Sequence, residues 1–310
     1  MKILPTELHA HIFNLACTDD GWTIRALSRV SIYFREVSRA YLYRNVSVSG
    51  NDMIFALLDR LETLPPRLRQ IHHLFLTDVL STSQQKPSPQ LSQQENQAVI
   101  RLITLAAPTL HSFSFVPSAP FSSTSLIARV FRTSFPLLKS LTISGFYPFP
   151  NSSGKFPSLK CLTLNGNRNP HGLFQMGTLE DACPRLESLE VTGLGLAGGF
   201  VLELEDALTA SEAWEQDDDR DGDIMPPAKL PQGVRRVTVQ AGPEPAVVAN
   251  SSGPLPDVAT MKDRVLMGRL QALKSRKATR VNGVEVVVLD RCLSPISAED
   301  VKRDWLLALA

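Results

Sequence analysis

The sequence is poor in the residues that mark a cysteine-stabilised, metal-binding or catalytic protein. Its four cysteines lie far apart and form no CxxC pair, which excludes a zinc knuckle and a dense disulfide framework. They are Cys17, Cys161, Cys183 and Cys292. The strings HExxH, GxSxG and GxxxxGK followed by Ser or Thr are also absent. The sequence therefore predicts no catalytic residues, no metal and no cofactor, and we expect a protein that is not an enzyme.

Neither sign of charge prevails, and no long hydrophobic run is present. The chain has 32 Lys and Arg against 31 Asp and Glu, a formal net charge of +1, which argues against a uniformly basic nucleic-acid binder. No apolar run reaches the roughly 18 to 20 residues that cross a bilayer. The opening residues, Met1 to Pro5, lack the apolar stretch of a secretory signal. We therefore expect neither a membrane nor a nucleic-acid partner, and a cytoplasmic or nuclear location.

Hydrophobic periodicity predicts helices near the start of the chain. One series steps by four, four and three residues, which places its members on one face of a helix that ends near Cys17; they are Leu4, Leu8, Ile12 and Leu15. A second series predicts a helix over residues 23–38; its members are Ile24, Leu27, Val30, Phe34 and Val37. Asp19 or Asp20 is suited to cap that second helix. The tract 41–48 predicts a short helix that passes into an extended link.

These helices carry a resemblance to a known family. The run LPTELHAHIFNLAC, continued by ALSRVSIYFREVSRAYLYRNVSV, resembles an F-box of the form frequent in fungal proteins. The resemblance covers residues 3–48 and implies a three-helix fold that docks the Skp adaptor of cullin-based ubiquitin ligases. The adaptor contacts that it implies are Leu4, Pro5, Leu8, Ile12, Leu27, Val30, Ser31 and Phe34. In the alternative interpretation, the same residues form an ordinary helical cap that is buried on the chain's own next domain.

The remainder of the chain contains an irregular repeat. Seven strings of the LxxLxL type occur, and those in the middle of the chain lie 21 to 28 residues apart. The strings are Ile71-Leu74-Leu76, Leu110-Phe113-Phe115, Leu138-Leu141-Ile143, Leu159-Leu162-Leu164, Leu186-Leu189-Val191, Val234-Val237-Val239 and Val284-Val287-Leu289. Each predicts a short strand, followed by a helix or irregular segment that returns along the other side. The run ACPRLESLEVTG also resembles a cysteine-containing leucine-rich repeat.

The predicted fold is therefore of the α/β class. It has a three-helix F-box at residues 1–48 and an irregular leucine-rich-repeat solenoid of parallel strands at residues 49–310, with long insertions at about 80–97 and 203–256. Return helices are predicted over residues 51–63, 92–106, 123–134 and 172–182. A further amphipathic helix with a basic outer face is predicted from Lys262 onward, with Met261, Val265, Met267, Leu270 and Leu273 as its apolar series. The run SAEDVKRDWLLALA predicts a closing helix.

Two strings imitate chemical motifs, and both favour a structural interpretation. Residues 193–198 spell GxGxxG after a strand, but no second strand ending in an acid follows, as a dinucleotide-binding fold requires. Residues 217–224 match the start of a calcium loop, but the twelfth position is Ala228 instead of Glu. We therefore expect a turn between repeats and a solvated acidic loop.

The resemblance implies a substrate-receptor subunit of a Skp-cullin-F-box ubiquitin ligase, which binds the Skp adaptor, and through it a cullin, by the F-box and a protein substrate by the repeats. Substrate contacts are expected at outward positions between the apolar residues of the strands: Lys139, Ser140, Thr142, Lys160, Cys161, Thr163, Glu187, Ser188 and Glu190. The alternative is a repeat-based interaction scaffold that works outside any ubiquitin ligase.

Overall fold

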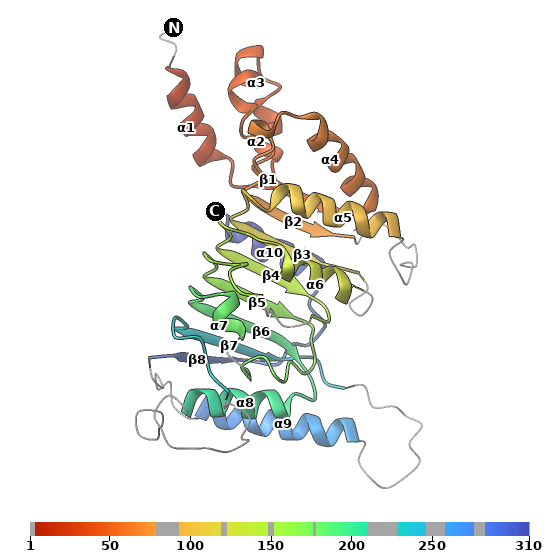
Figure 1. Cartoon of the computed structure of the whole chain (residues 1–310), viewed down its shortest axis with the longest axis vertical. Helices are drawn as coiled ribbons and strands as arrows, with labels where there is room; N and C mark the ends of the chain where they lie inside the picture. Colours follow the sequence, from red (N-terminus) through yellow and green to blue (C-terminus); the bar gives the residue numbers. More distant parts are fainter. Residues whose placement is uncertain are drawn as a thin grey trace. The chain divides into compact units, whose positions relative to one another are not determined.

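A computed structural model describes residues 4–78, 93–118, 123–147, 152–175, 178–209, 228–245, 258–275 and 283–309. The fold is α/β, with a single parallel sheet in which eight strands follow the order of the sequence (Figure 1). The strands are β1 (Asn45–Ser49), β2 (His73–Thr77), β3 (Ser112–Val116), β4 (Ser140–Ser144), β5 (Cys161–Asn165), β6 (Ser188–Leu194), β7 (Arg236–Ala241) and β8 (Glu285–Leu289). The predicted α/β class and parallel strands are therefore confirmed.

Each predicted string of apolar residues supplies one strand, from β2 to β8. The register places Leu74 beside Phe113 in one pair of strands and Leu162 beside Leu189 in another, and all four side chains are buried. Alternate residues of successive strands thus form continuous apolar rows on one face of the sheet. In the tract 41–48, the predicted short helix is absent, since residues 41–43 form turns. The predicted extended link is the further strand β1, which pairs with β2.

The last string was predicted in the wrong phase. Val286 and Val288 of β8 align with the buried Val237 and Val239 of β7, so the inward positions come one residue earlier than predicted. Because four apolar residues follow one another in β8, the pattern fits either phase, and the pairing with β7 fixes the register. Leu289 is consequently 38% exposed.

The described chain divides into two compact units. Unit 1 comprises residues 1–140 and 297–310, and unit 2 comprises residues 141–296. The predicted boundary between residues 48 and 49 therefore falls inside unit 1. Within the insertions predicted at about 80–97 and 203–256, the described residues include the start of a helix at Gln93 and the end of another helix at Thr209. Residues 79–92, 210–227 and 246–257 lie outside the described part.

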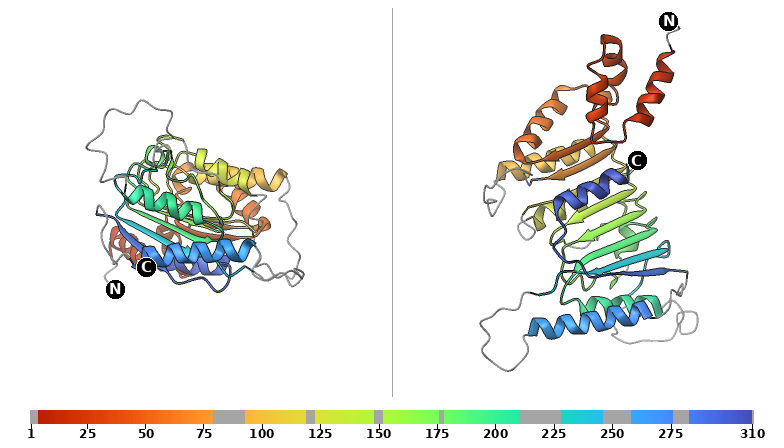
Figure 2. Two further views of the ribbon diagram at one scale, coloured as in Figure 1. Left: turned by 90° about the horizontal axis from the view of Figure 1, so that it is seen from below. Right: turned by 180° about the vertical axis from the view of Figure 1, so that it is seen from behind.

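The helices of unit 1 largely follow their predicted bounds. They are α1 (Thr6–Ala16), α2 (Trp22–Leu27), α3 (Ile32–Ser38), α4 (Asn51–Thr63), the short 3-10 helix η1 (Pro66–Leu68), α5 (Gln93–Ala106), α6 (Thr124–Arg132) and α10 (Ala298–Leu307). The buried faces of α4 and α5 consist of apolar residues at helical spacing, and the two helices pack against each other. The closing helix α10 lies against β2 and β3 (Figure 2).

The single helix predicted over residues 23–38 is in fact two helices. Ser31 adopts an extended backbone conformation with φ −160° and ψ 167°, and its hydroxyl accepts a hydrogen bond from the Phe34 N–H at 3.1 Å. Ser31 therefore acts as the N-cap of α3 and interrupts the helical path that the apolar series alone would allow. Sequence periodicity continues across such a break, which explains the error.

Unit 2 contains three described helices, α7 (Thr178–Ala182), α8 (Gly198–Thr209) and α9 (Val258–Ser275). α8 and α9 pack side by side, and α9 also contacts β8 (Figure 1). The apolar series predicted for α9 was partly wrong, because its buried residues include Leu266, whereas Met261 and Val265 are each 54% exposed. α7 is shorter than predicted, since residues 172–175 form turns instead of a helix.

The string GxGxxG is explained by close approach between neighbouring strand ends. Gly193 has φ +73°, and a Cβ atom there would lie 3.1 Å from the backbone nitrogen of Gly166. Gly166 in turn lies against Gly145, and Gly242 lies against the carbonyl of Gly193. These four glycines form what we call the glycine column. The first glycine of the motif is thus needed for packing between strand ends. The expected turn does not begin at Gly193, because this residue still belongs to β6, at a register shift between Val191 and Leu194.

Candidate partner-binding surface

A small aromatic cluster holds α1 and α3 together. Phe13 of α1 is 2% exposed and lies 5.5 Å from Phe34 of α3, between ring centroids. His9 packs edge-on against Phe34 and Tyr33, and its Nδ1 lies 3.1 Å from the Tyr33 hydroxyl oxygen. The inner face of α1 is therefore the side that carries His9 and Phe13, and not the side with the leucine stripe.

The periodic apolar stripe of α1 faces outward instead. The exposed fractions are 47% for Leu4, 49% for Leu8, 47% for Ile12 and 64% for Leu15. Pro5, which precedes the first helical residue, is exposed as well. A stripe of this kind on a short helix marks a surface that is suited to burial against another molecule.

The other predicted adaptor contacts lie on α2, on α3 and in the turn between them. Val30 is 66% exposed, whereas Leu27 and Phe34 are half-buried. Ser31 is exposed but has a structural role as the N-cap of α3. Sequence reasoning did not select two neighbouring apolar side chains, Trp22 and Ile32, which are 70% and 77% exposed. We call the eight predicted contacts together with these two residues the N-terminal apolar surface.

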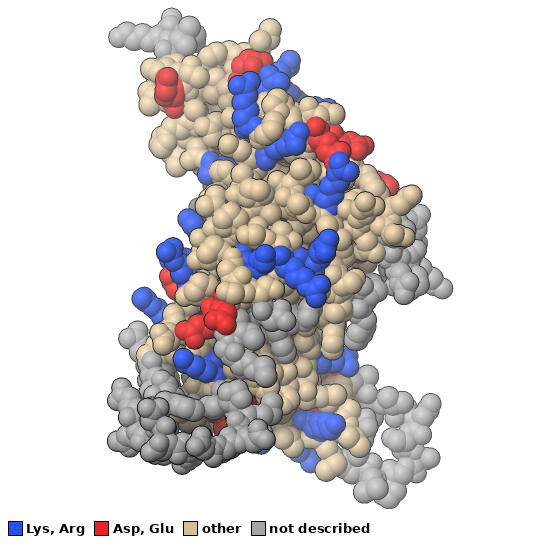
Figure 3. All heavy atoms as spheres, viewed as in Figure 1, with Lys and Arg blue, Asp and Glu red and all other residues tan. Residues whose placement is uncertain are grey.

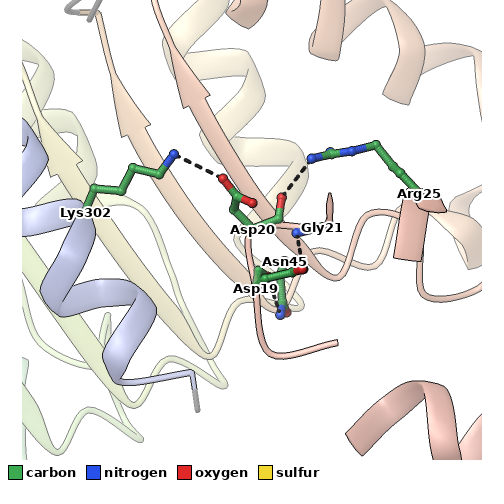
Figure 4. Close-up of polar contacts among 6 residues, drawn as sticks. All are labelled: Asp19, Asp20, Gly21, Arg25, Asn45 and Lys302. Atoms are coloured by element: carbon green, nitrogen blue, oxygen red, sulfur yellow. Dashed lines mark hydrogen bonds and ion pairs between the residues drawn. The ribbon is translucent and has the colours of Figure 1, made fainter. Parts of the chain in front are cut away.

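The turn between α1 and α2 fixes these helices to the first strand (Figure 4). The carboxylate of Asp19 accepts a hydrogen bond from the Gly21 N–H at 2.9 Å and another from the Thr23 N–H at 2.8 Å. The N-cap residue of α2 is Gly21, so neither Asp19 nor Asp20 occupies the predicted cap position, although Asp19 binds an N–H group of the first helical turn. The side-chain amide of Asn45 donates to the carbonyls of Cys17 and Asp19. Gly21 has φ +88°, and a Cβ atom there would lie 2.9 Å from the Asn45 carbonyl oxygen, so only glycine fits.

A second anchor comes from the far end of the sequence. Lys302 of α10 forms an ion pair with Asp20, with 3.1 Å between Nζ and Oδ2, and both side chains are about two-thirds buried (Figure 4). On the same helix, Trp305 packs against Phe75 of β2 at 5.9 Å between ring centroids. α10 therefore supports both the turn that carries α2 and the sheet to which Asn45 belongs.

The predicted substrate-binding residues of unit 2 lie on the outward face of β4 to β6, where several interact with one another. Lys160 pairs with Glu187 at 2.7 Å, and the Thr163 hydroxyl donates to Glu190 at 3.3 Å. The hydrogen bond from Lys160 lowers the pKa of Glu187. Thr142 on β4 is half-buried. This face presents paired charges, and not a field of one sign.

In unit 1, the central outward positions of β2 and β3 are buried, unlike those of β5 and β6 in unit 2. Lys139 is exposed just before β4, but the outward positions of β2 and β3 are covered by α10. Phe75 is 1% exposed and its neighbour Ser114 is 4% exposed. The expectation that residues between the apolar positions face solvent therefore fails in these two strands, because the closing helix packs on them.

Three histidines lie together at the start of β2 and β3. The ring centroids of His72 and His111 are 4.8 Å apart, and His73 Nδ1 lies 2.9 Å from the Ser112 hydroxyl oxygen. Burial, reinforced by nearby cations that include Arg44, lowers the pKa of His72 and of His73 to about 4. Burial and Lys139 also lower the pKa of His111. These rings are therefore neutral near pH 7.

Sequence reasoning misassigned one buried acid. Glu203 stands at the start of the insertion predicted at about 203–256, but it lies in α8 and is 4% exposed. Its carboxylate accepts hydrogen bonds from the N–H groups of Gly172 and Phe174, both at 2.6 Å, and contacts His171. It thereby holds the turns that replace the predicted helix. The apolar residues on both sides of Glu203 were the one feature of the sequence that indicated a buried helix there.

The remaining motif-like segments supply no further site among the described residues. Positions 217–224 of the calcium-loop string and the basic residues 276–280 lie outside the described part. Within α9, Arg269 pairs with Glu205 of the acidic run, and Asp263 pairs with Arg291. No group of three His, Cys, Asp or Glu residues that could hold a metal ion is found in the part of the chain that the structure describes.

Comparisons with known proteins give no relative for this arrangement. No protein-family model matches the chain, and neither the curated proteins nor the solved structures contain a match. Among the described helices, none combines the length and the apolar character that a membrane-spanning segment needs.

Proposed function

We propose that this protein is a substrate-receptor subunit of a Skp-cullin-F-box ubiquitin ligase. In this proposal α1, α2 and α3 form an F-box that binds the Skp adaptor, and the strands with their return segments form a degenerate leucine-rich-repeat domain that binds a protein substrate. The protein would not react chemically itself. Its contribution would be proximity, because it raises the effective concentration of the substrate near the ubiquitin-carrying enzyme.

The outward leucine stripe of α1 is the observation that supports this proposal best. If the N-terminal helices were only a cap on the chain's own sheet, the most regular apolar stripe should be buried there. Instead Leu8 and Ile12 remain about half exposed, while α1 uses His9 and Phe13 for its internal contacts. An exposed apolar stripe fits a helix that buries it against a partner, and so favours an adaptor-binding module over the scaffold alternative.

For substrate binding, the outward face of β4 to β6 in unit 2 is the surface we propose. Thr142, Thr163 and Glu190 project from adjacent strands there, and the ion pair of Lys160 with Glu187 lies at the start of β5 and β6. A substrate that displaces or bridges such a pair must offer both donors and acceptors, so a polar protein segment fits better than a purely acidic or basic one.

The adaptor proposal is tested by binding of the full chain to a purified Skp adaptor. We expect a stable complex, and we expect the variants Leu8→Asp and Ile12→Asp each to weaken it at least tenfold, because a buried carboxylate would meet the apolar partner. Leu307→Asp is the matched control, since Leu307 is 70% exposed on α10, and it should bind like the unmodified chain. Circular dichroism checks that each variant folds.

Two results would contradict the proposal. The first is the absence of any complex with the intact chain, and the second is equal binding by Leu8→Asp, Ile12→Asp and Leu307→Asp. Co-purification from cells separates the two functions that the sequence leaves open. Recovery of a cullin with the intact chain, lost in Leu8→Asp, supports a ligase subunit, whereas recovery of partners without any cullin supports the scaffold.

A further inference from the structure

A cavity of about 390 Å³ lies beside the N-terminal apolar surface and has no role in the proposed adaptor contact. Its walls come from α3, from the turn after α3, from α4 and from η1. The volume lies within the range of roughly 300 to 1,000 Å³ that small-molecule sites occupy. We call it the arginine cavity, because Arg35, Arg39 and Arg60 line it.

The charged lining of the arginine cavity is predominantly positive. The three guanidinium groups face a single carboxylate, that of Glu36. Glu36 lies 3.9 Å from Arg39, and both side chains are more than half exposed, so this pair is weak. Among the described residues, no carboxylate pairs with Arg35 or Arg60. In Figure 3, basic side chains over α3 and α4 lie among acidic ones.

Two of the arginines are held in place by hydrogen bonds from Nε, which leave their terminal amino groups available to a ligand. Arg35 Nε donates to the carbonyl of Ser28 at 3.3 Å, and Arg60 Nε donates to the Tyr43 hydroxyl oxygen at 3.3 Å. The terminal amino groups of both guanidinium groups have no hydrogen-bond partner within the described ranges. Because Tyr43 accepts from Arg60, its own hydroxyl proton remains available to donate to a ligand.

Apolar side chains complete the lining. Leu42, Leu64 and Leu68 are partly buried and line the same cavity as the arginines. A ligand that fits must therefore combine an oxyanion, which guanidinium groups bind through two parallel hydrogen bonds, with an apolar or aromatic body. A bare inorganic anion would leave the leucines uncovered, and an uncharged ring would leave the arginines unpaired.

We propose that the arginine cavity binds a phosphate monoester carried on an apolar or aromatic group. Arg35 and Arg60 contact the phosphate oxygens, Tyr43 donates a further hydrogen bond, and the leucines contact the carrier. This inference is independent of the proposed adaptor binding.

Calorimetric titration of the full chain with phenyl phosphate tests the proposal. We expect saturable binding that is at least tenfold tighter than the binding of phenol or of inorganic phosphate. Arg35→Gln and Arg60→Gln should each weaken it about tenfold or more. Tyr43→Phe should weaken it a few-fold, because the ring stays and only the hydroxyl is lost. Arg132→Gln on α6 is the control, since its exposed side chain lies outside the cavity lining and should not alter binding.

The carrier is identified by a second titration with a capped tripeptide that contains phosphotyrosine. Tighter binding of the tripeptide than of phenyl phosphate assigns the site to a phosphorylated protein segment, and equal or weaker binding assigns it to a free phosphoester. The proposal is overturned if phenyl phosphate does not bind at millimolar concentration, or if it binds equally to Arg60→Gln and Arg132→Gln. Adaptor binding by Arg60→Gln, measured in parallel, reports separately on the adaptor proposal.

Discussion

At position 193, the close approach of the Gly166 backbone requires a glycine, so packing and not ligand binding explains this residue. Its φ of +73° is a region that disfavours residues with a Cβ atom, and the space where a Cβ would lie is occupied by the backbone of Gly166. The glycine column therefore limits how closely neighbouring strand ends of unit 2 can approach one another. Substitution of Gly166, Gly193 or Gly242 should displace the backbone of the adjacent glycine in the column.

We expect Gly193→Ala to destabilise the protein more than Gly283→Ala. Both positions have a positive φ, which costs an alanine about 1 to 2 kcal/mol. Gly283 has open space where a Cβ would lie, whereas at Gly193 the backbone must also move. Free energies of unfolding from urea denaturation give the comparison.

Gly268→Ala is the control for these glycine substitutions. Gly268 lies inside α9 with no atom within 4 Å of an added Cβ, so alanine should stabilise the protein there by about 0.5 to 1 kcal/mol through helix propensity. Equal losses at Gly193 and Gly283 would show that close approach within the glycine column contributes nothing.

Among the elements, α10 combines three roles. Its N-terminus is fixed by a capping box between Ser297 and Asp300, its side chain Lys302 pairs with Asp20, and its Trp305 covers Phe75. A helix of ten residues is marginal by itself, so its stability depends on these contacts. In return it shields the outward face of β2 and β3.

Trp305→Ala should therefore reduce the free energy of unfolding by about 3 to 5 kcal/mol, because the removal of a large buried ring leaves a cavity against Phe75. Leu307→Ala on the same helix, where the side chain is 70% exposed, should change it by less than about 0.5 kcal/mol. Hydrogen exchange localises the effect, and we expect faster exchange in β2 and β3 of the Trp305 variant. A Trp305 variant as stable as the Leu307 variant would show that α10 is dispensable.

At the scale of the whole molecule, the described histidines whose pKa is lowered all belong to unit 1. Burial lowers the pKa of His72 and His73 to about 4, from about 6.5 in an unfolded chain. Between these values the unfolded chain binds protons that the folded chain does not, so stability falls as the pH decreases. The loss begins near pH 6.5, is complete near pH 4, and is reinforced by the adjacent Arg44, Lys139 and His111.

We expect the double variant His72→Gln, His73→Gln to lose less thermal stability than the unmodified protein when the pH is lowered from 7 to 5. His11→Gln is the control, since His11 is exposed on α1 and should leave the pH dependence unchanged. Melting temperatures at the two pH values give the comparison. Parallel pH profiles for all three proteins would rule out these histidines as the source of acid sensitivity.

The sequence was sufficient to predict the strands and most helices because their apolar residues recur at regular spacing. Seven strands and the helix Asn51–Thr63 lie where periodicity placed them. Periodicity does not report breaks or long-range packing, however. It extended a helix across Ser31, placed Glu203 at the start of an insertion, and gave no indication that α10 would cover Phe75. Those outcomes depend on a side-chain cap, a buried carboxylate and a contact between residues far apart in the chain.

The same periodicity identified the apolar stripe of the predicted partner surface, but it did not determine which way the stripe faces. The stripe of Leu4, Leu8 and Ile12 was evident from its spacing, but spacing cannot say whether such a stripe faces the chain's own core or the outside. The side chains that hold α1 in place, His9 and Phe13, interrupt the series and were not selected. The arginine cavity was also beyond reach, because its walls join segments whose approach depends on tertiary structure.

The contact between Phe75 and Trp305 can form only late in the synthesis of the chain. These residues are separated by 230 positions, and a ribosome that adds roughly 5 to 20 residues per second needs about 12 to 46 s to pass from one to the other. During that interval β2 and β3 present an uncovered apolar face at Phe75, which is a site for chaperone binding or for pairing with another nascent chain. The face of β2 and β3 that α10 covers is therefore exposed until residues 297–310 of unit 1 have been synthesised.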